Sequence, residues 1–132
     1  MTTRIYWIST AITAFVLLSG GLADLLGADW AVAGITALGY PAYLAAILGV
    51  WKLLGTVAIT VPGYPRLKEW AYAGIVFDLS GAAVSHLVMG SPVFHPVVTT
   101  TLVVVAGLSW ATRPASRRLA APPSPQREPV AA

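Results

Sequence analysis

The fold is decided by residues 41–89, which read PAYLAAILGVWKLLGTVAITV, PGYPRLK and EWAYAGIVFDLSGAAVSHLVM. Two apolar runs, 41–61 and 69–89, flank a short segment rich in proline, glycine and charge. Each run has about 20 residues, and a helix of that length covers about 30 Å, the thickness of the hydrocarbon core of a bilayer. Pro41 and Pro62 stand at the two ends of the first run, where a helix tolerates proline. This stretch therefore predicts two transmembrane helices joined by a turn at 62–68.

Two further apolar runs lie outside this stretch, at 5–26 and at 96–112. The segment 27–40 contains acidic, aromatic and glycine residues, and it predicts a loop with an interfacial turn or a short helix. We therefore expect an all-α, four-helix transmembrane bundle over residues 5–112. Residues 113–132 are rich in proline and arginine without an apolar period, so we expect a disordered tail there.

The composition supports a membrane protein and excludes several other classes. The chain of 132 residues is 57% hydrophobic and only 10% charged, whereas ordinary soluble domains are about 25% charged. It contains no cysteine, which excludes a disulfide framework, a thiolate metal site and thiol redox chemistry within the chain.

The basic residues predict the orientation of the bundle. They precede the first run, separate the second from the third, and follow the fourth, at Arg4, Arg66, Lys68, Arg113, Arg117, Arg118 and Arg127. The positive-inside rule places these segments in the cytoplasm, so we expect a multi-pass protein of the cell membrane with both termini cytoplasmic. The net charge of +3 is explained in this way, and no nucleic-acid partner is expected. A cleaved signal peptide after Arg4 stays open as an alternative, although the run is long for one.

Two charged residues are expected near the middle of the bilayer. Lys52 lies about 15 Å from Pro62 along a helix, and Asp78 reaches nearly the same height on the following antiparallel run. A lysine at the bilayer centre costs about 2.5 to 3.5 kcal/mol on insertion scales unless it is paired or hydrated. We therefore predict that Lys52 and Asp78 pair, either as a lock between two helices or as a functional site.

Small residues share a helical face with Asp78, and they predict a close packing face on the third run. They are Ala71, Gly74, Gly81, Ala82 and Ser85. His86 lies about 12 Å beyond Asp78; it is either a hydrogen-bonded packing residue or a titrating contact to a ligand. No metal site is expected, because His86 and His95 are separated by the break at residues 90–92 and no further ligands accompany them.

A second narrow seam of small and polar residues lies on the first run, at Thr13, Leu17, Gly20, Gly21 and Asp24. Asp24 lies near the outer end, where a carboxylate can stay hydrated. If it turns inward instead, it would join His86, Lys52 and Asp78 in a polar file through the outer half of the bundle. Gly49 and Thr56 beside Lys52 also suggest close helix contact. No nucleotide-binding, hydrolase, zinc or thiol motif is present, and no catalytic residue is assigned.

These motifs resemble those of the DoxX-like family of small four-helix bacterial membrane proteins. The resemblance rests on residues 39–44, 49–55, 65–74 and 77–86, which read GYPAYL, GVWKLLG, PRLKEWAYAG and FDLSGAAVSH. It implies a polar signature at Lys52, Glu69, Asp78 and His86. It also implies a bacterial inner-membrane location, and it links the chain to a superfamily with members in membrane redox complexes.

Three functions remain open at this stage. The first is an accessory or scaffold subunit that presents the polar intramembrane site to a partner or a lipid-like ligand. The second is a component of a quinone-linked oxidoreductase, with quinone as the candidate cofactor and a membrane redox subunit as partner. The third is a small transporter or proton path. The candidate site residues are Lys52, Asp78, His86, Ser85 and Asp24.

Overall fold

The computed structural model describes residues 1–121, and these form five α-helices and one short 3-10 helix. The elements are α1 (Thr2–Leu25), α2 (Asp29–Ala37), α3 (Leu44–Thr60), α4 (Pro65–Val88), α5 (Phe94–Ala111) and η1 (Ala115–Arg117). The all-α prediction is confirmed. The short α2 confirms the expected short helix in the segment 27–40. The last part of the expected tail, 122–132, lies outside the described residues.

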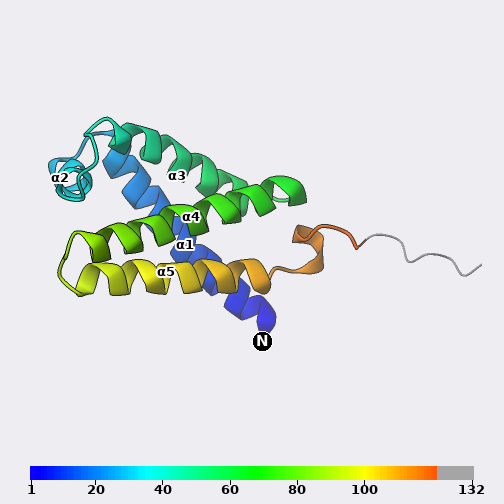
Figure 1. The fold of residues 1–132 in the computed structure, drawn as a ribbon. Coiled ribbons are helices and arrows are strands. Elements are labelled where there is room, and N and C mark those ends of the chain that lie inside the picture. Colours follow the sequence, from blue (N-terminus) through cyan, green and yellow to red (C-terminus); the bar gives the residue numbers. More distant parts are fainter. Residues whose placement is uncertain (122–132) are drawn as a thin grey trace, which may run out of the picture.

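The four longer helices form a closed bundle. α1 packs between α3 and α5, while α4 packs closely on α5 and more sparsely on α3. The N-terminus, the α3–α4 turn and the end of α5 share one end of the bundle, and α2 and the α4–α5 turn lie at the other (Figure 1). We call the first the basic end, because the arginines and lysines of the connecting segments gather there.

The lengths and surfaces of the helices identify a multi-pass membrane protein. α1, α4 and α5 are long and apolar enough to cross a bilayer, while α3 is apolar but has 17 residues, the lower limit of about 17 to 25 for a span. Large apolar side chains cover their outer faces, among them Phe15, Trp51, Phe77 and Leu87. Such surface is unfavourable in water and suits lipid.

The interior combines an apolar cluster with one buried hydroxyl network. The cluster draws on all four longer helices and contains Leu17, Ile59, Tyr72, Ile75, Leu79 and Ala106. Ser109 of α5 hydrogen-bonds both Thr10 of α1 and Tyr72 of α4, each at 2.6 Å. Because a buried hydroxyl without a partner is costly, these bonds favour one arrangement of α1, α4 and α5.

α4 begins at Pro65, four residues earlier than the sequence predicts, and this places Lys68 in its first turn rather than in a linker. Proline suits the first turn of a helix, since its missing N–H has no acceptor there. The Lys68 side chain is fully buried and donates to the carbonyl oxygens of Ala58, at 2.7 Å, and of Val61. Pro62 has no N–H to offer the Ala58 carbonyl one turn earlier. Lys68 therefore caps the end of α3.

Three further charged residues complete this region, which we call the basic-end cap: Lys68, Glu69, Arg113 and Arg117. Glu69 accepts hydrogen bonds from Arg113, at 2.6 Å, and from the Trp110 indole, at 2.7 Å. Arg117 donates to the hydroxyl of Tyr6 and to the carbonyl oxygen of Ile59, both at 3.2 Å. The first residues of the expected tail therefore belong to the folded bundle.

Candidate functional site

An ion pair joins α1 and α3 within the apolar part of the bundle. Lys52 lies at the centre of α3, and its Nζ atom is 2.7 Å from Oδ2 of Asp24, near the end of α1. The Asp24 side chain is 7% exposed and that of Lys52 is 22% exposed. Asp24 therefore turns inward and is withdrawn from the hydrated position considered above.

The predicted ion pair between Lys52 and Asp78 is wrong, because Asp24 occupies the position of partner. Among the described residues, the ion pairs are Lys52 with Asp24 and Arg113 with Glu69. The error lies in the choice of acid. The cost of a charge in lipid correctly indicated that Lys52 has an acidic partner, but it could not indicate which neighbouring helix supplies that partner.

A close crossing of two glycines determines this choice. A Cβ atom added to Gly49 would lie 2.7 Å from the backbone nitrogen of Leu25 and 2.8 Å from the carbonyl oxygen of Gly21. One added to Gly21 would lie 2.9 Å from the Cβ atom of Lys52. Only glycine allows the two backbones to come so near. The crossing brings Lys52 beside the last turn of α1, within reach of Asp24.

This crossing confirms most of the seam predicted on α1. Thr13, Leu17, Gly21 and Asp24 are buried, and Gly21 makes the closest approach to α3. Gly20 does not take part, since a Cβ atom there would meet nothing within 4 Å.

A cavity of about 420 Å³ lies between α3 and α4, where these two helices pack sparsely. Its lining is mostly apolar, with one ammonium and one carboxylate. The residues are Leu17, Leu48, Trp51, Lys52, Leu54, Gly55, Leu67, Trp70, Ala71, Gly74, Ile75 and Asp78. Trp51 is 67% exposed and Trp70 is 81% exposed, so the cavity opens sideways through the face that lipid would cover.

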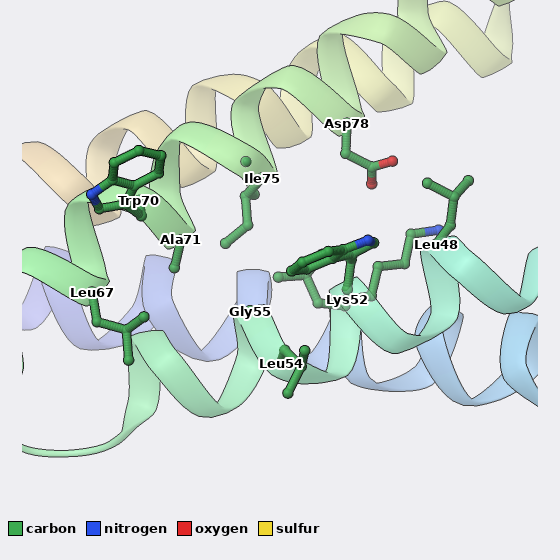
Figure 2. Close-up of a pocket in the computed structure, with 12 residues that line it drawn as sticks. Leu48, Lys52, Leu54, Gly55, Leu67, Trp70, Ala71, Ile75 and Asp78 are labelled. Atoms are coloured by element: carbon green, nitrogen blue, oxygen red, sulfur yellow. The ribbon is translucent and has the colours of Figure 1, made fainter.

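Asp78 is the acidic side chain of this cavity. Figure 2 shows its carboxylate directed from α4 into the space above α3, on the same side as Lys52. Within residues 1–121 no hydrogen bond or ion pair engages this carboxylate. Lys52 and Asp78 thus share a cavity without sharing a bond.

The packing face of small residues that we predicted on α4 is not observed at Gly74 or Gly81. Ala71 and Gly74 line the cavity, and a Cβ atom added to Gly74 or Gly81 would meet no atom within 4 Å. The buried face of α4 carries larger side chains, including Tyr72 and Leu79. These larger side chains fill the core, and Ala71 packs against them, whereas Gly74 and Gly81 face open space. The expectation from membrane packing rules is therefore corrected at these two glycines.

Ser85 and His86 do not join the cavity. Ser85 hydrogen-bonds the hydroxyl of Tyr40 at 2.8 Å. Nδ1 of His86 lies 3.0 Å from the Ser91 hydroxyl, and its ring stacks on that of His95 with centroids 4.9 Å apart. The predicted polar file is therefore divided. Asp24, Lys52 and Asp78 gather near the cavity, while His86 at the end of α4 and His95 at the start of α5 lie beside the α4–α5 turn. In the described part of the chain no group of three or more potential metal ligands is found.

The arrangement is suited to holding an amphiphile, with polar groups at one part of the cavity and an apolar trough along the rest. Sequence reasoning missed the trough, notably Trp51, Leu67 and Trp70. A signal was available, because Trp70 and Leu67 precede Asp78 on nearby turns of α4. Sequence alone could not show that α3 leaves this face uncovered.

Comparison with known proteins gives one family. The model of the DoxX-like family matches residues 8–111, more than half of the chain. No curated protein and no solved structure matches this chain.

Proposed function

The chain belongs to the DoxX-like family, and from that premise we propose that it is an accessory subunit of the bacterial inner membrane whose α3–α4 cavity holds a lipid-like ligand. The observation that carries the proposal is the cavity itself. It is about 420 Å³ in volume, within the range of about 300 to 1,000 Å³ that is usual for small-molecule sites. It combines a long apolar trough with the charged groups of Lys52 and Asp78.

The proposed topology has four crossings, α1, α3, α4 and α5, with both termini in the cytoplasm. The arrangement in Figure 1 supports it, because the N-terminus, the α3–α4 turn and the end of α5 share one end. The basic residues of the connecting segments lie at this same end, and the segments 27–40 and 90–93 contain no lysine or arginine. The positive-inside rule then places the basic end in the cytoplasm.

The lateral opening supports a ligand that comes from the bilayer. Trp51, Leu54, Leu67 and Trp70 line the cavity and are each at least half exposed, so an apolar ligand could enter between α3 and α4 without crossing water. A partner protein in the same membrane could reach the ligand through this opening. This is the basis for proposing an accessory or scaffold role.

The proposal is tested by filling the cavity with a larger side chain and measuring which bound small molecules are lost. In Gly74→Leu the new side chain has free space on the cavity side, since no atom lies within 4 Å of the added Cβ. Gly81→Leu is the matched control, because it lies on the same helix with equal space but outside the cavity lining. Purified proteins would be extracted and their bound small molecules identified by mass spectrometry.

We expect an amphiphile in stoichiometric amount from the wild type and from Gly81→Leu, and at least a tenfold loss from Gly74→Leu. Equal recovery from all three would contradict the cavity as a binding site. If the bound molecule is a quinone and only Gly74→Leu loses it, the cavity is confirmed as the binding site. The function would then be that of a quinone-linked oxidoreductase component and not that of an accessory subunit.

The topology has its own test, helped by the absence of cysteine from the chain. Single cysteines at exposed Ala33, Arg66 and Ser116 can be labelled in intact cells with a membrane-impermeant maleimide. We expect labelling of Ala33→Cys alone, with Arg66→Cys and Ser116→Cys labelled only after the membrane is opened. Labelling of Arg66→Cys in intact cells would contradict the proposed orientation.

A further inference from the structure

The charges around the cavity do not balance. The ammonium of Lys52 is committed to Asp24 at 2.7 Å, and the carboxylate of Asp78 enters the cavity without a protein partner in the part of the chain that the structure describes. Two carboxylates and one ammonium leave an excess of negative charge. In a low-dielectric setting, such an excess attracts a cation strongly and repels an anion.

No other basic side chain can supply the missing charge from the lining. Lys52 is the one basic residue among the residues that line the cavity. The cationic groups of Lys68, Arg113 and Arg117 are engaged in the basic-end cap by carbonyl oxygens, by Tyr6 and by Glu69. Among the residues that the structure describes, none pairs with Asp78, so its carboxylate is neutralised either by a proton or by a cationic ligand.

We propose that the cavity selects an amphiphile with a single protonated amine, whose ammonium group binds Asp78 and whose apolar part lies along the trough toward Leu67. This inference rests on the proposed function and names the ligand class for the same site. Hydrogen bonds between an ammonium and a carboxylate are about twice as strong as those between neutral groups. Anionic amphiphiles are disfavoured, because Asp24 already neutralises Lys52.

The shape of the cavity agrees with this ligand. From Leu67 to Asp78 the lining of α4 extends about 16 Å at the rise of an α-helix. Apart from Asp78, its members there are apolar: Leu67, Trp70, Ala71, Gly74 and Ile75. The indole ring of Trp51 also lines the cavity, and indoles attract ammonium groups that come within about 6 Å. A compact cationic head with one apolar chain matches both parts.

The test compares three probes that share a ten-carbon chain and differ in the head group: decylamine, decanol and decanoate. Radiolabelled probes would be equilibrated at neutral pH with the full-length protein in phosphatidylcholine nanodiscs. Binding to nanodiscs that carry no protein would be subtracted to remove partition into lipid, and Gly74→Leu would be measured in the same way. We expect wild-type protein to bind decylamine at least tenfold more tightly than decanol, and decanoate more weakly than decanol.

Two variants of Asp78 isolate the role of its charge. Asp78→Asn keeps the size of the side chain, and we expect decylamine to fall to the affinity of decanol while decanol itself is unchanged within about twofold. Asp78→Glu restores the carboxylate and should restore the preference for decylamine. Adding phosphatidylethanolamine to the nanodiscs identifies the source: displacement of decylamine indicates a resident amine lipid, and no displacement indicates a free hydrophobic amine.

The outcomes separate this inference from the proposed function. If wild type binds decylamine and decanol equally and Gly74→Leu abolishes both, the cavity is a ligand site but the charge selectivity is wrong. A preference for decanoate would also overturn the selectivity, because Lys52 would then be the recognition group. If Gly74→Leu binds all three probes as the wild type does, the proposed function itself fails.

Discussion

Two lysines on neighbouring helices occupy opposite kinds of surroundings. Lys68 is fully buried in the first turn of α4 and caps the carbonyl oxygens at the end of α3. Lys52 lies at the centre of α3, 22% exposed, with one carboxylate as partner and a cavity beside it. In the first region the polar groups are used to close the end of the bundle. In the second, one carboxylate stays available.

This difference separates polar residues that stabilise the fold from a carboxylate that is available to bind a ligand. In the basic-end cap of the described chain, Nη1 of Arg113 is the one buried side-chain atom without a partner. The remaining polar groups there join α3, α4, α5 and the segment after α5. Around Lys52, the pair with Asp24 joins α1 to α3, and Asp78 is bonded to no other residue within 1–121. We therefore expect substitutions to grade from large losses of stability at the cap to almost none at Asp78.

The largest effect is expected for Lys68→Met. It removes the charged donor of the Ala58 and Val61 carbonyls in a fully buried position, and each hydrogen bond from a charged group contributes about 1.5 to 3 kcal/mol. We expect a loss of about 3 to 4 kcal/mol in the free energy of unfolding in detergent, followed by circular dichroism. Exposed Arg66→Met is the control and should change it by less than about 0.5 kcal/mol. Equal effects would remove the contrast between the cap and its surroundings.

Asp24→Leu should follow, with a loss of about 2 to 3 kcal/mol, because it removes the carboxylate that is bonded to Lys52 and joins α1 to α3. The value lies below the range for fully buried pairs, since Lys52 is partly exposed. The double change Asp24→Leu with Lys52→Met should recover most of the loss, as it removes both charges. Additive losses in the double variant would show that packing, and not the charge, holds α1 on α3.

Gly49→Ala tests the crossing that creates the pair. Its Cβ atom would lie 2.7 Å from a backbone nitrogen of α1, so the helices must separate at an expected cost of about 2 kcal/mol. Gly20→Ala is the matched control on α1, where nothing lies within 4 Å, and it should be neutral or slightly stabilising. Unfolding measurements that rank Gly20→Ala as the more harmful change would place the contact elsewhere.

The smallest effect on stability is expected for Asp78→Asn, within about 0.5 kcal/mol, because no described protein group depends on this carboxylate. The same thermal and chemical unfolding measurements in detergent would show it. A loss as large as that of Asp24→Leu would mean that Asp78 is a structural counter-charge, and the difference between the two regions would disappear.

Much of the helical framework was predictable. Proline and glycine mark the ends of the apolar runs, and α1, α3 and α5 begin and end within a few residues of the predicted bounds. The start of α4 was misplaced because Arg66 and Lys68 suggested a solvated linker. In the structure Pro65 is the first residue of α4, and the Lys68 side chain reaches the carbonyl oxygens at the end of α3. Charge in a sequence does not reveal whether a side chain reaches a carbonyl of the preceding helix.

The site was half predictable. The energetic cost of charge in lipid singled out Lys52 and Asp78, and the seam on the first run added Asp24; all three gather near one cavity. The face of the third run added Ser85 and His86, which the structure places with Tyr40, Ser91 and His95 instead. The sequence placed a glycine three residues before each member of the pair, Gly21 before Asp24 and Gly49 before Lys52, which puts glycine and charge on one helix face. It did not indicate that these two faces meet.

The sequence by itself determined the membership in the DoxX-like family, the all-α architecture and the need for a counter-charge at Lys52, because composition, helix-ending residues and the cost of charge in lipid are properties of single segments. The tertiary structure alone decided that Asp24 is the partner of Lys52, that Ala71 and Gly74 of α4 line a cavity, and that Asp78 has no partner among the described residues. These depend on which helix faces cross and how closely. A periodicity of 3.6 residues fixes the faces of one helix but does not choose its neighbour.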